Sequence, residues 1–107
     1  MNRYFMNKLS STQRSYLRSQ SHHLEPVVLI GKNGITDVTI EAVNQALDAR
    51  ELIKIKFREF KDNKQSISDE IAAADNCHVV CMIGHTVILF RQNSDPEKQN
   101  IHLPGIK

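Results

Sequence analysis

The sequence has few of the residues that mark several protein classes, since its 107 residues include no tryptophan, two cysteines and three prolines. Cys77 and Cys81 lie four apart in one apparent segment, so they cannot build the disulfide framework of a small secreted protein. The longest apolar runs have the length of a strand, and the start of the chain lacks the apolar stretch of a signal peptide. We therefore expect a cytoplasmic protein with reduced thiols and no membrane contact.

Charge is modest overall but unevenly distributed. The net charge of +2 and the isoelectric point of about 8.6 lie below the range that by itself points to nucleic acid. The basic residues nevertheless gather in two segments, residues 1–34 and 52–64, which are separated by an acidic segment over residues 35–51. A surface built from the two basic segments would attract an anionic partner.

Hydrophobic periodicity predicts one domain with the order αβαβαββ. Ser10 and Gln13 have the spacing of a capping box at the start of a helix that runs to Leu24. Its apolar side holds Leu9, Tyr16, Leu17 and Leu24, and Arg14, Arg18 and His22 form a stripe nearly opposite, facing solvent or a partner.

Two further helices are expected, each with an apolar side that faces a core. Thr36 is the predicted N-cap of the second helix, and the third helix is predicted over much of residues 64–76. The predicted buried positions are Val38, Ala42, Val43, Ala46 and Leu47 in the second helix, and Ile67, Ile71 and Ala74 in the third.

Four strands are expected between and after these helices. Residues 27–30, "VVLI", show no polar alternation, which is typical of a strand covered on both faces. Residues 52–58, "LIKIKFR", alternate strictly, so that Lys54, Lys56 and Arg58 share the outer face. The runs "HVVCMI" and "TVILFR" flank Gly84 and His85, as in a hairpin with a type II′ turn. The predicted fold is a two-layer α/β domain with a small four-stranded mixed sheet, whose first two strands are parallel.

The segment "IGKNGIT", residues 30–36, joins the first strand to the second helix. Backbone N–H groups at a helix start favour an anion, and Lys32 and Asn33 add a positive charge and amide donors. A G-x-x-G spacing alone is a weak signal, because an ordinary turn explains many such matches. Its position between the two basic segments favours a phosphate ligand, and KH modules clamp the backbone of single-stranded nucleic acid with such a loop.

Four stretches together resemble a known family. In chain order they are "LSSTQRSYLRSQSHHLEPVVLIGKNGIT", "ALDARELIKIKF", "VVCMIGHTVILFR" and "IHLP". From Leu9 to Pro104 they resemble the CRM (chloroplast RNA splicing and ribosome maturation) domain in its stand-alone bacterial YhbY-type form. The resemblance implies a fold similar to the C-terminal domain of bacterial translation initiation factor three, RNA binding, and association with precursors of the large ribosomal subunit.

The resemblance also assigns parts of the chain. We expect an N-terminal extension over residues 1–8, an RNA-binding domain over 9–91, and a polar tail over 92–107 with 101–104 docked on the domain. By the family match, the RNA-contacting loop is Gly31, Lys32, Asn33 and Gly34. From the charge pattern we add as RNA contacts Arg14, Arg18, Lys54, Lys56 and Arg58. A monomer without a cofactor is expected.

The sequence leaves two alternatives to RNA binding. An enzyme would hold a phosphorylated substrate in the same loop, but no activated nucleophile, P-loop or acid pair accompanies it. A protein-interaction module would bind an acidic partner with the same basic surface, and charge alone does not exclude it. Cys77, His78, Cys81 and His85 lack the spacing of a zinc site, and alternation places Cys81 with Val79 and Ile83, so no metal is expected. With few aromatic residues, base stacking is expected to be a minor contribution.

Overall fold

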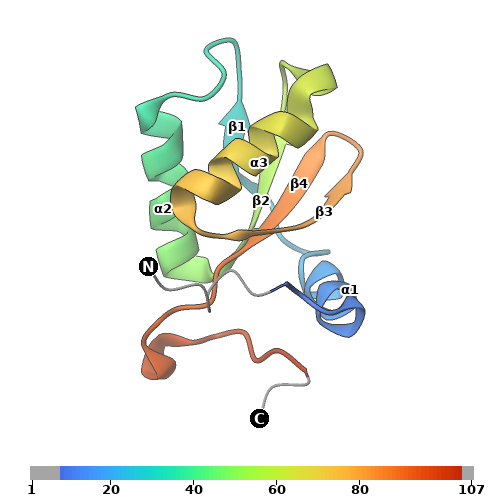
Figure 1. The fold of residues 1–107 in the computed structure, drawn as a ribbon, viewed down its shortest axis with the longest axis vertical. Coiled ribbons are helices and arrows are strands. Elements are labelled where there is room, and N and C mark those ends of the chain that lie inside the picture. The colour runs from blue at the N-terminus through green and yellow to red at the C-terminus, as the bar shows by residue number, and fades with distance from the viewer. Residues whose placement is uncertain (1–7, 105–107) are drawn as a thin grey trace.

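The computed structural model describes residues 8–104, and within them the predicted order αβαβαββ is confirmed (Figure 1). The predicted extension over residues 1–8 lies outside the described residues except for Lys8, as do residues 105–107 of the predicted tail. The helices and strands, with two short 3-10 helices, are α1 (Ser11–Gln20), β1 (Pro26–Ile30), α2 (Asp37–Arg50), β2 (Leu52–Phe57), η2 (Lys61–Asn63), α3 (Lys64–Asp75), β3 (His78–Ile83), β4 (Thr86–Phe90) and η3 (Pro96–Lys98).

The four strands form one mixed sheet in the order β1-β2-β4-β3. β1 and β2 are parallel and connect through α2, whereas β4 pairs antiparallel with both β2 and β3. The turn between β3 and β4 has Gly84 at φ +60°, and His85 is not among the residues with positive φ, as a type II′ turn requires. The predicted α/β fold with a mixed sheet is therefore confirmed.

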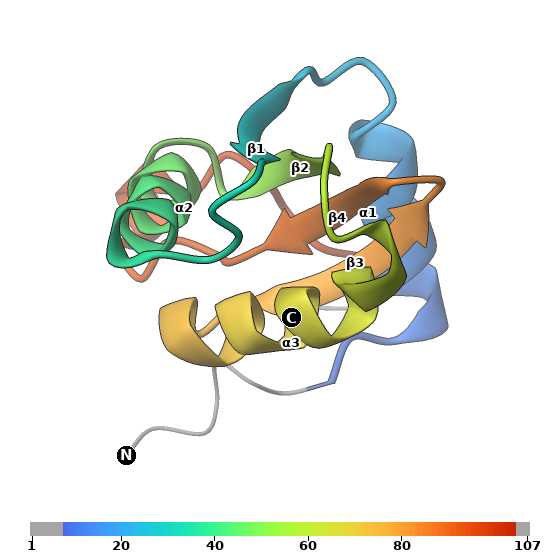
Figure 2. The same ribbon diagram turned by 90° about the horizontal axis from the view of Figure 1, so that it is seen from above.

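The main core lies between α2, α3 and one face of the sheet (Figure 2). Ile53, Ile55 and Phe57 of β2 are buried there, as the strict alternation of this strand predicts. A smaller apolar cluster occupies the opposite face, where α1 packs against β3. Its residues are Leu9, Leu17, Leu52, Val80, Ile88 and Phe90, with Tyr16, Leu24, Ile101 and Leu103 packed against them.

The predicted buried sides of α2 and α3 are partly wrong. Val43 and Leu47 are buried as expected, but Val38 is 78% exposed and Ala42 is exposed too. At 3.6 residues per turn Val38 lies opposite Leu47, so both cannot face the sheet. Ile40 packs against the core instead.

In α3 the buried arc is shifted toward polar positions. Ile67 and Ile71 are buried, but Ala74 is exposed, while Ser68 and Asp75 are buried. Apolar periodicity cannot identify polar residues that are buried. The predicted buried side of α3 is therefore rotated by about one position from the side that packs against the core.

β1 is not covered on both faces, contrary to the prediction. Val28 and Ile30 face the main core, whereas Val27 and Leu29 are 38% and 49% exposed. β1 is an edge strand, and α1 covers the opposite face only near the other edge, at β3. Burial therefore alternates along β1 although its residues 27–30 are all apolar.

The predicted grouping of Cys81 with Val79 is also wrong. The pairing of β3 with β4 shifts between Val79 and Cys81, as in a β-bulge. Val79 consequently packs against the main core, and Cys81 against the cluster beneath α1. Cys77 is buried in the main core, where burial and then the charge of Asp75 raise the pKa of its thiol to about 12.

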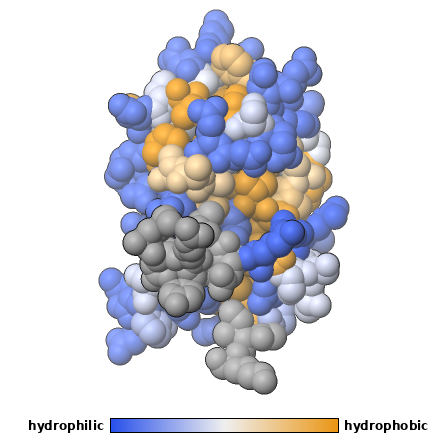
Figure 3. Space-filling model, viewed as in Figure 1, coloured by the Kyte–Doolittle hydropathy of each residue, from blue (hydrophilic) through white to orange (hydrophobic). Residues whose placement is uncertain are grey.

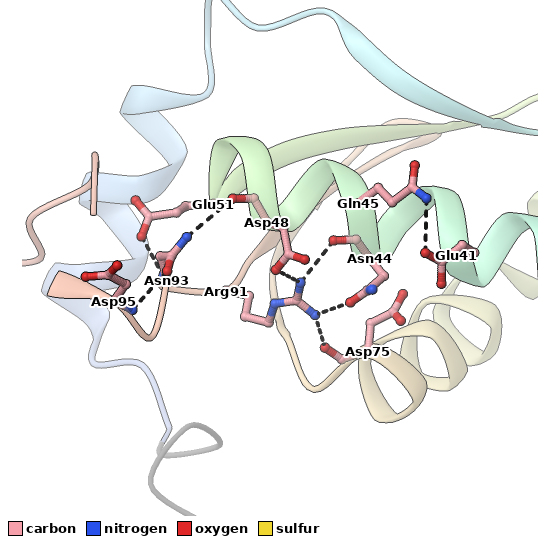
Figure 4. A network of polar contacts seen from close by, with 9 residues as sticks. All are labelled: Glu41, Asn44, Gln45, Asp48, Glu51, Asp75, Arg91, Asn93 and Asp95. Atoms are coloured by element: carbon pink, nitrogen blue, oxygen red, sulfur yellow. Dashed lines mark hydrogen bonds and ion pairs between the residues drawn. The ribbon is translucent and has the colours of Figure 1, made fainter. Parts of the chain in front are cut away.

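Arg91 joins both helices of the main layer to the end of β4 (Figure 4). Its guanidinium donates from Nη1 to Asn44 Oδ1 and to the carbonyl of Asp75, at 2.9 and 2.7 Å. From Nη2 it donates to the carbonyl of Asn44 and pairs with Asp48 Oδ1, at 3.0 and 2.8 Å. One side chain thereby satisfies groups on α2 and at the end of α3.

The polar segment after Arg91 is fastened by a buried carboxylate. Glu51 is 1% exposed, and its two carboxylate oxygens accept backbone N–H groups from Asn93, Asn100 and Ile101 at 2.6 to 2.8 Å. Ile101 and Leu103 then pack against the cluster beneath α1, and the carbonyl of Pro104 accepts a hydrogen bond from Gln13. Residues of the predicted tail, among them Ile101, Leu103 and Pro104, therefore contact the domain.

Candidate functional site

The loop between β1 and α2 forms a tight turn with an exposed tip. Gly34 N–H donates to the carbonyl of Gly31 at 3.0 Å, which leaves Lys32 and Asn33 exposed at the two central positions. Gly34 has a φ of +64°, a conformation that favours glycine. The side chain of Thr36 then accepts the N–H of Thr39 and caps α2, as predicted.

Gly31 leaves open space beside its backbone. A Cβ added at Gly31 would meet no atom within 4 Å, so a ligand can approach the main chain there. α2 begins at Asp37, three residues after Gly34, and its first N–H groups carry the positive end of the helix dipole. Asp37 in the first turn of α2 opposes this field in part.

The connection after β2 is joined to the base of this loop. The carbonyl of Ile30 accepts the N–H groups of both Arg58 and Glu59, at 2.9 and 3.1 Å. Arg58 and its neighbours are therefore held beside the Gly31–Gly34 turn, and both connections lie at the same end of the molecule (Figure 1).

The sheet face opposite α2 and α3 carries the predicted lysines. Lys56 is exposed and Lys54 half-buried, and both point away from the main core. The strand register aligns Leu29, Lys56, Thr86 and Ile83 in one row across all four strands. Two cations and the exposed side chains of Leu29 and Ile83 thus share this open face.

The α1 arginines reach the same face at its β3 edge. Cys81 pairs with Ile88, which pairs with Lys54, and Arg18 and Arg14 act on Cys81 electrostatically. Burial raises the pKa of the Cys81 thiol, and these two arginines lower it in part. A shallow hollow of about 270 Å³ lies here, lined by Ser11, Arg14, Ser15, Arg18 and Cys81.

Arg14 differs from the expectation that it faces away from the domain. It is half-buried, and its Nη1 donates to the carbonyls of Val79 and Val80. These two carbonyls lie at the bulge in β3, and both accept hydrogen bonds from the guanidinium of Arg14. Arg18, by contrast, is exposed as expected.

Three residues at this end of the sheet were not among the predicted site residues. The ring of Phe60 lies 3.4 Å from the position of an added Cβ at Gly34. Lys64 Nζ contacts the carbonyl of Gly84 and His85 Nδ1. Partial loss of hydration, then the charges of Lys64 and Lys61, lower the pKa of His85. The aromatic residue and the two lysines that follow Arg58 in "EFKDNK" were the signal that could have extended the site.

The face on the other side of the molecule has a different character. In the view of Figure 1, with α3 in front of the sheet, the surface is mostly hydrophilic, with hydrophobic residues in its middle and upper parts (Figure 3). Asp37, Glu41 and Asp48 of α2 are exposed. Carboxylates repel phosphate, so the cationic loop and the open sheet face are the better candidates for an anionic ligand.

Within residues 8–104, no group of three or more His, Cys, Asp or Glu side chains is placed to hold a metal ion. Cys77 and Cys81 pack on opposite faces of the sheet, and the high pKa of Cys77 leaves little thiolate at neutral pH. None of the helices between Lys8 and Pro104 is long and apolar enough to cross a membrane.

Comparison with known proteins connects this geometry to a family. A family model described as "CRS1 / YhbY (CRM) domain" matches residues 9–91. The Bacillus subtilis protein named "Probable RNA-binding protein YqeI" is 33% identical over 97 residues, which cover 90% of this chain and 99% of that protein. A Haemophilus influenzae protein named "RNA-binding protein" is 36% identical over 100 residues, covering 92% and 98%. The solution structure of the hypothetical protein SAV1595 from Staphylococcus aureus superposes with a TM-score of 0.76 and 31% identity, covering 91% of this chain and all of that one.

Proposed function

Because the chain belongs to the CRS1 / YhbY (CRM) domain family, we propose that it is a non-enzymatic RNA-binding protein of the cytoplasm. Relatives similar over nearly their whole length carry the name RNA-binding protein. The observation that carries the proposal is the exposed Gly31–Gly34 turn at the start of α2, with Lys32 at its tip and Arg58 at its base.

The turn would hold the sugar-phosphate backbone of one strand. A phosphate at the open side of Gly31 can accept N–H groups at the helix start, and Lys32 and Arg58 supply formal charge. From there the strand would continue over the open face past Lys56 and Lys54 toward Arg18. Such contacts position RNA without reading its sequence.

The RNA that we propose is ribosomal RNA in precursors of the large subunit, bound by a monomer. The resemblance of residues 9–104 to stand-alone bacterial CRM proteins supports this choice. A single small domain with a few phosphate contacts suits a factor that binds exposed RNA during assembly and later leaves.

Charge reversal on the proposed surface tests the RNA-binding role. Lys32→Glu with Lys54→Glu should weaken binding to single-stranded RNA at least tenfold and leave thermal unfolding unchanged, since Lys32 is exposed and Lys54 is half-buried outside the main core. Lys98→Glu is the matched control, because Lys98 is exposed on η3 in the C-terminal segment. Equal affinity of the folded double variant and the wild type would refute this surface.

The salt dependence of RNA binding measures how many phosphates the surface neutralises. If about four phosphates are neutralised, raising salt from roughly 50 to 200 mM should weaken RNA binding on the order of fiftyfold, following the slope for single strands. A flat response would exclude phosphate contacts as the source of the affinity.

A further inference from the structure

Phe60 combines two features that are unfavourable for folding. Its side chain is 43% exposed, although aromatic rings gain most when buried. Its backbone has φ +57° and ψ +37°, the left-handed region that bulky residues rarely occupy. Asparagine or glycine would adopt this conformation with less strain, so the presence of phenylalanine calls for another explanation.

The surrounding backbone fixes the position of Phe60. On one side, Arg58 and Glu59 donate their N–H groups to the carbonyl of Ile30. On the other side, the carbonyl of Phe60 accepts the N–H of Asn63 at 2.9 Å and starts η2. The ring is therefore attached to a held segment rather than to a freely moving loop.

The ring of Phe60 lies against the Gly31–Gly34 turn at Gly34. Three of its carbons lie 3.4 to 3.8 Å from the position of an added Cβ at Gly34. Phe60 is nevertheless 43% exposed, so it remains open to a ligand of the same turn. The exposed cations Lys32, Arg58 and Lys61 lie in the same connections.

We propose that Phe60 is a stacking platform for one base of the RNA strand whose backbone the Gly31–Gly34 turn holds. The inference rests on the proposed RNA-binding function and adds a base contact to a surface that otherwise reads only phosphates. Aromatic rings accept the face of any base, so the contact favours unpaired RNA over a duplex without selecting a sequence.

Substitution of Phe60 in the full chain tests the contact with a 12-nucleotide oligouridine probe. Phe60→Leu retains an apolar side chain against Gly34 but removes the ring, and should weaken binding about five- to a hundredfold. Phe60→Tyr should bind like the wild type. Both variants should unfold at the wild-type temperature, which confirms that the loop is intact.

The salt slope distinguishes stacking from charge. Phe60→Leu should weaken binding by the same factor at each salt concentration, leaving the slope of log affinity against log salt unchanged. Lys32→Gln, in the adjoining turn, should lower the slope by about 0.7 because it removes one of the proposed phosphate contacts.

A second measurement locates the base. An abasic nucleotide is moved along the probe, and at one position it should weaken wild-type binding but leave Phe60→Leu binding unchanged. Additive losses at every position would overturn the stacking contact. Absence of RNA binding by the wild type would overturn the proposed function as well. Normal binding by Phe60→Leu, when Lys32→Glu with Lys54→Glu loses binding, would overturn the stacking contact alone.

Discussion

Gly31 and Gly34 have different roles in the same turn. Gly34 has φ +64° and lies beside the Phe60 ring, so its lack of a Cβ serves the backbone conformation. Gly31 has no neighbour within 4 Å of an added Cβ, and its φ lies outside the left-handed range, so its lack of a Cβ leaves room beside the loop. Gly34 is therefore needed for folding of the turn, and Gly31 for the approach of a ligand.

Substitution of the two glycines should give opposite results. Gly34→Val should destabilise the fold by about 1–3 kcal/mol, because a β-branched residue resists positive φ. Gly31→Val should leave stability near that of the wild type but weaken RNA binding at least tenfold by filling the space for a phosphate. Chemical denaturation and RNA affinity are measured for both. Normal binding by folded Gly31→Val would exclude the turn as a backbone clamp.

Asp75 is a buried carboxyl whose charge opposes folding. Burial raises its pKa above the ordinary value, Arg91 lowers it in part, and Glu41 raises it further. Asp75 Oδ2 has no hydrogen-bond partner, whereas the carbonyl of the same residue accepts from Arg91. A raised carboxyl pKa in the folded state means that folding binds a proton, so stability from this group falls as pH rises through the raised pKa.

Asp75→Asn should therefore be more stable than the wild type at pH 7. The difference should shrink as pH falls through the raised pKa and vanish below the unfolded value, where the wild-type carboxyl is neutral in both states. Urea unfolding of both proteins from pH 3 to pH 8 measures it, and the comparison cancels the titration of the other groups. A difference that stays constant with pH would show that charge is not its cause.

Single residues show where the sequence is and is not informative. The capping box is predictable because it is local, and Ser10 and Gln13 indeed exchange both hydrogen bonds, at 3.0 and 3.1 Å. The half-buried place of Arg14 and the exposed ring of Phe60 depend on a bulge and on a left-handed residue, which local sequence does not reveal.

At the level of elements, strands with strict alternation were predicted well and continuous apolar runs were not. β2 displays its two faces directly in the sequence, whereas the apolar run of β1 gives no hint that one face stays open. The exposure of Val27 and Leu29 follows from the edge position of β1 and from the placement of α1 at β3, and both are tertiary facts. The loop itself was predicted from the local spacing of its glycines. The residues that lie next to it, such as Phe60, could be identified only from the fold.

The link between α2, β2 and the C-terminal segment depends on Glu51. This residue has φ +67° and ψ −42°, and its N–H donates to the carbonyl of Leu47 at the end of α2. Its carboxylate accepts three N–H groups of the segment that follows β4. A strained, buried glutamate is thus retained where it attaches the segment to the domain.

Glu51→Ala should destabilise the protein by about 2–4 kcal/mol, because it leaves three N–H groups without their charged acceptor. The backbone amides of Asn100 and Ile101 should exchange with solvent much faster than in the wild type. The amides of the main core should exchange faster only to the extent that the global free energy of unfolding falls. Glu97→Ala, at an exposed position in the same segment, is the control. Unchanged exchange at Asn100 and Ile101 would contradict the attachment.

For the whole molecule, the distribution of charge matters more than its sum. The net charge is only +2, yet the acidic residues of α2 lie on one side, while Lys32, Lys54, Lys56 and Arg18 belong to the loop, the open sheet face and α1. A domain of this kind can attract RNA to one surface and repel it from another. Its affinity rests on a few phosphate contacts, so binding should be reversible and sensitive to salt.

The proposed place of action follows from that reversible binding. We expect the protein to travel with immature large ribosomal subunits rather than with translating ribosomes, because maturing RNA structure and ribosomal proteins would cover its site and displace it. Gradient fractionation at low salt, with immunodetection across free, precursor and mature particles, tests this expectation. The Lys32→Glu and Lys54→Glu double variant should shift to the free fraction, and Lys98→Glu should sediment like the wild type. Detection of the wild type only in the free fraction, even after crosslinking, would exclude the assembly role and leave RNA binding elsewhere in the cell as the function of this surface.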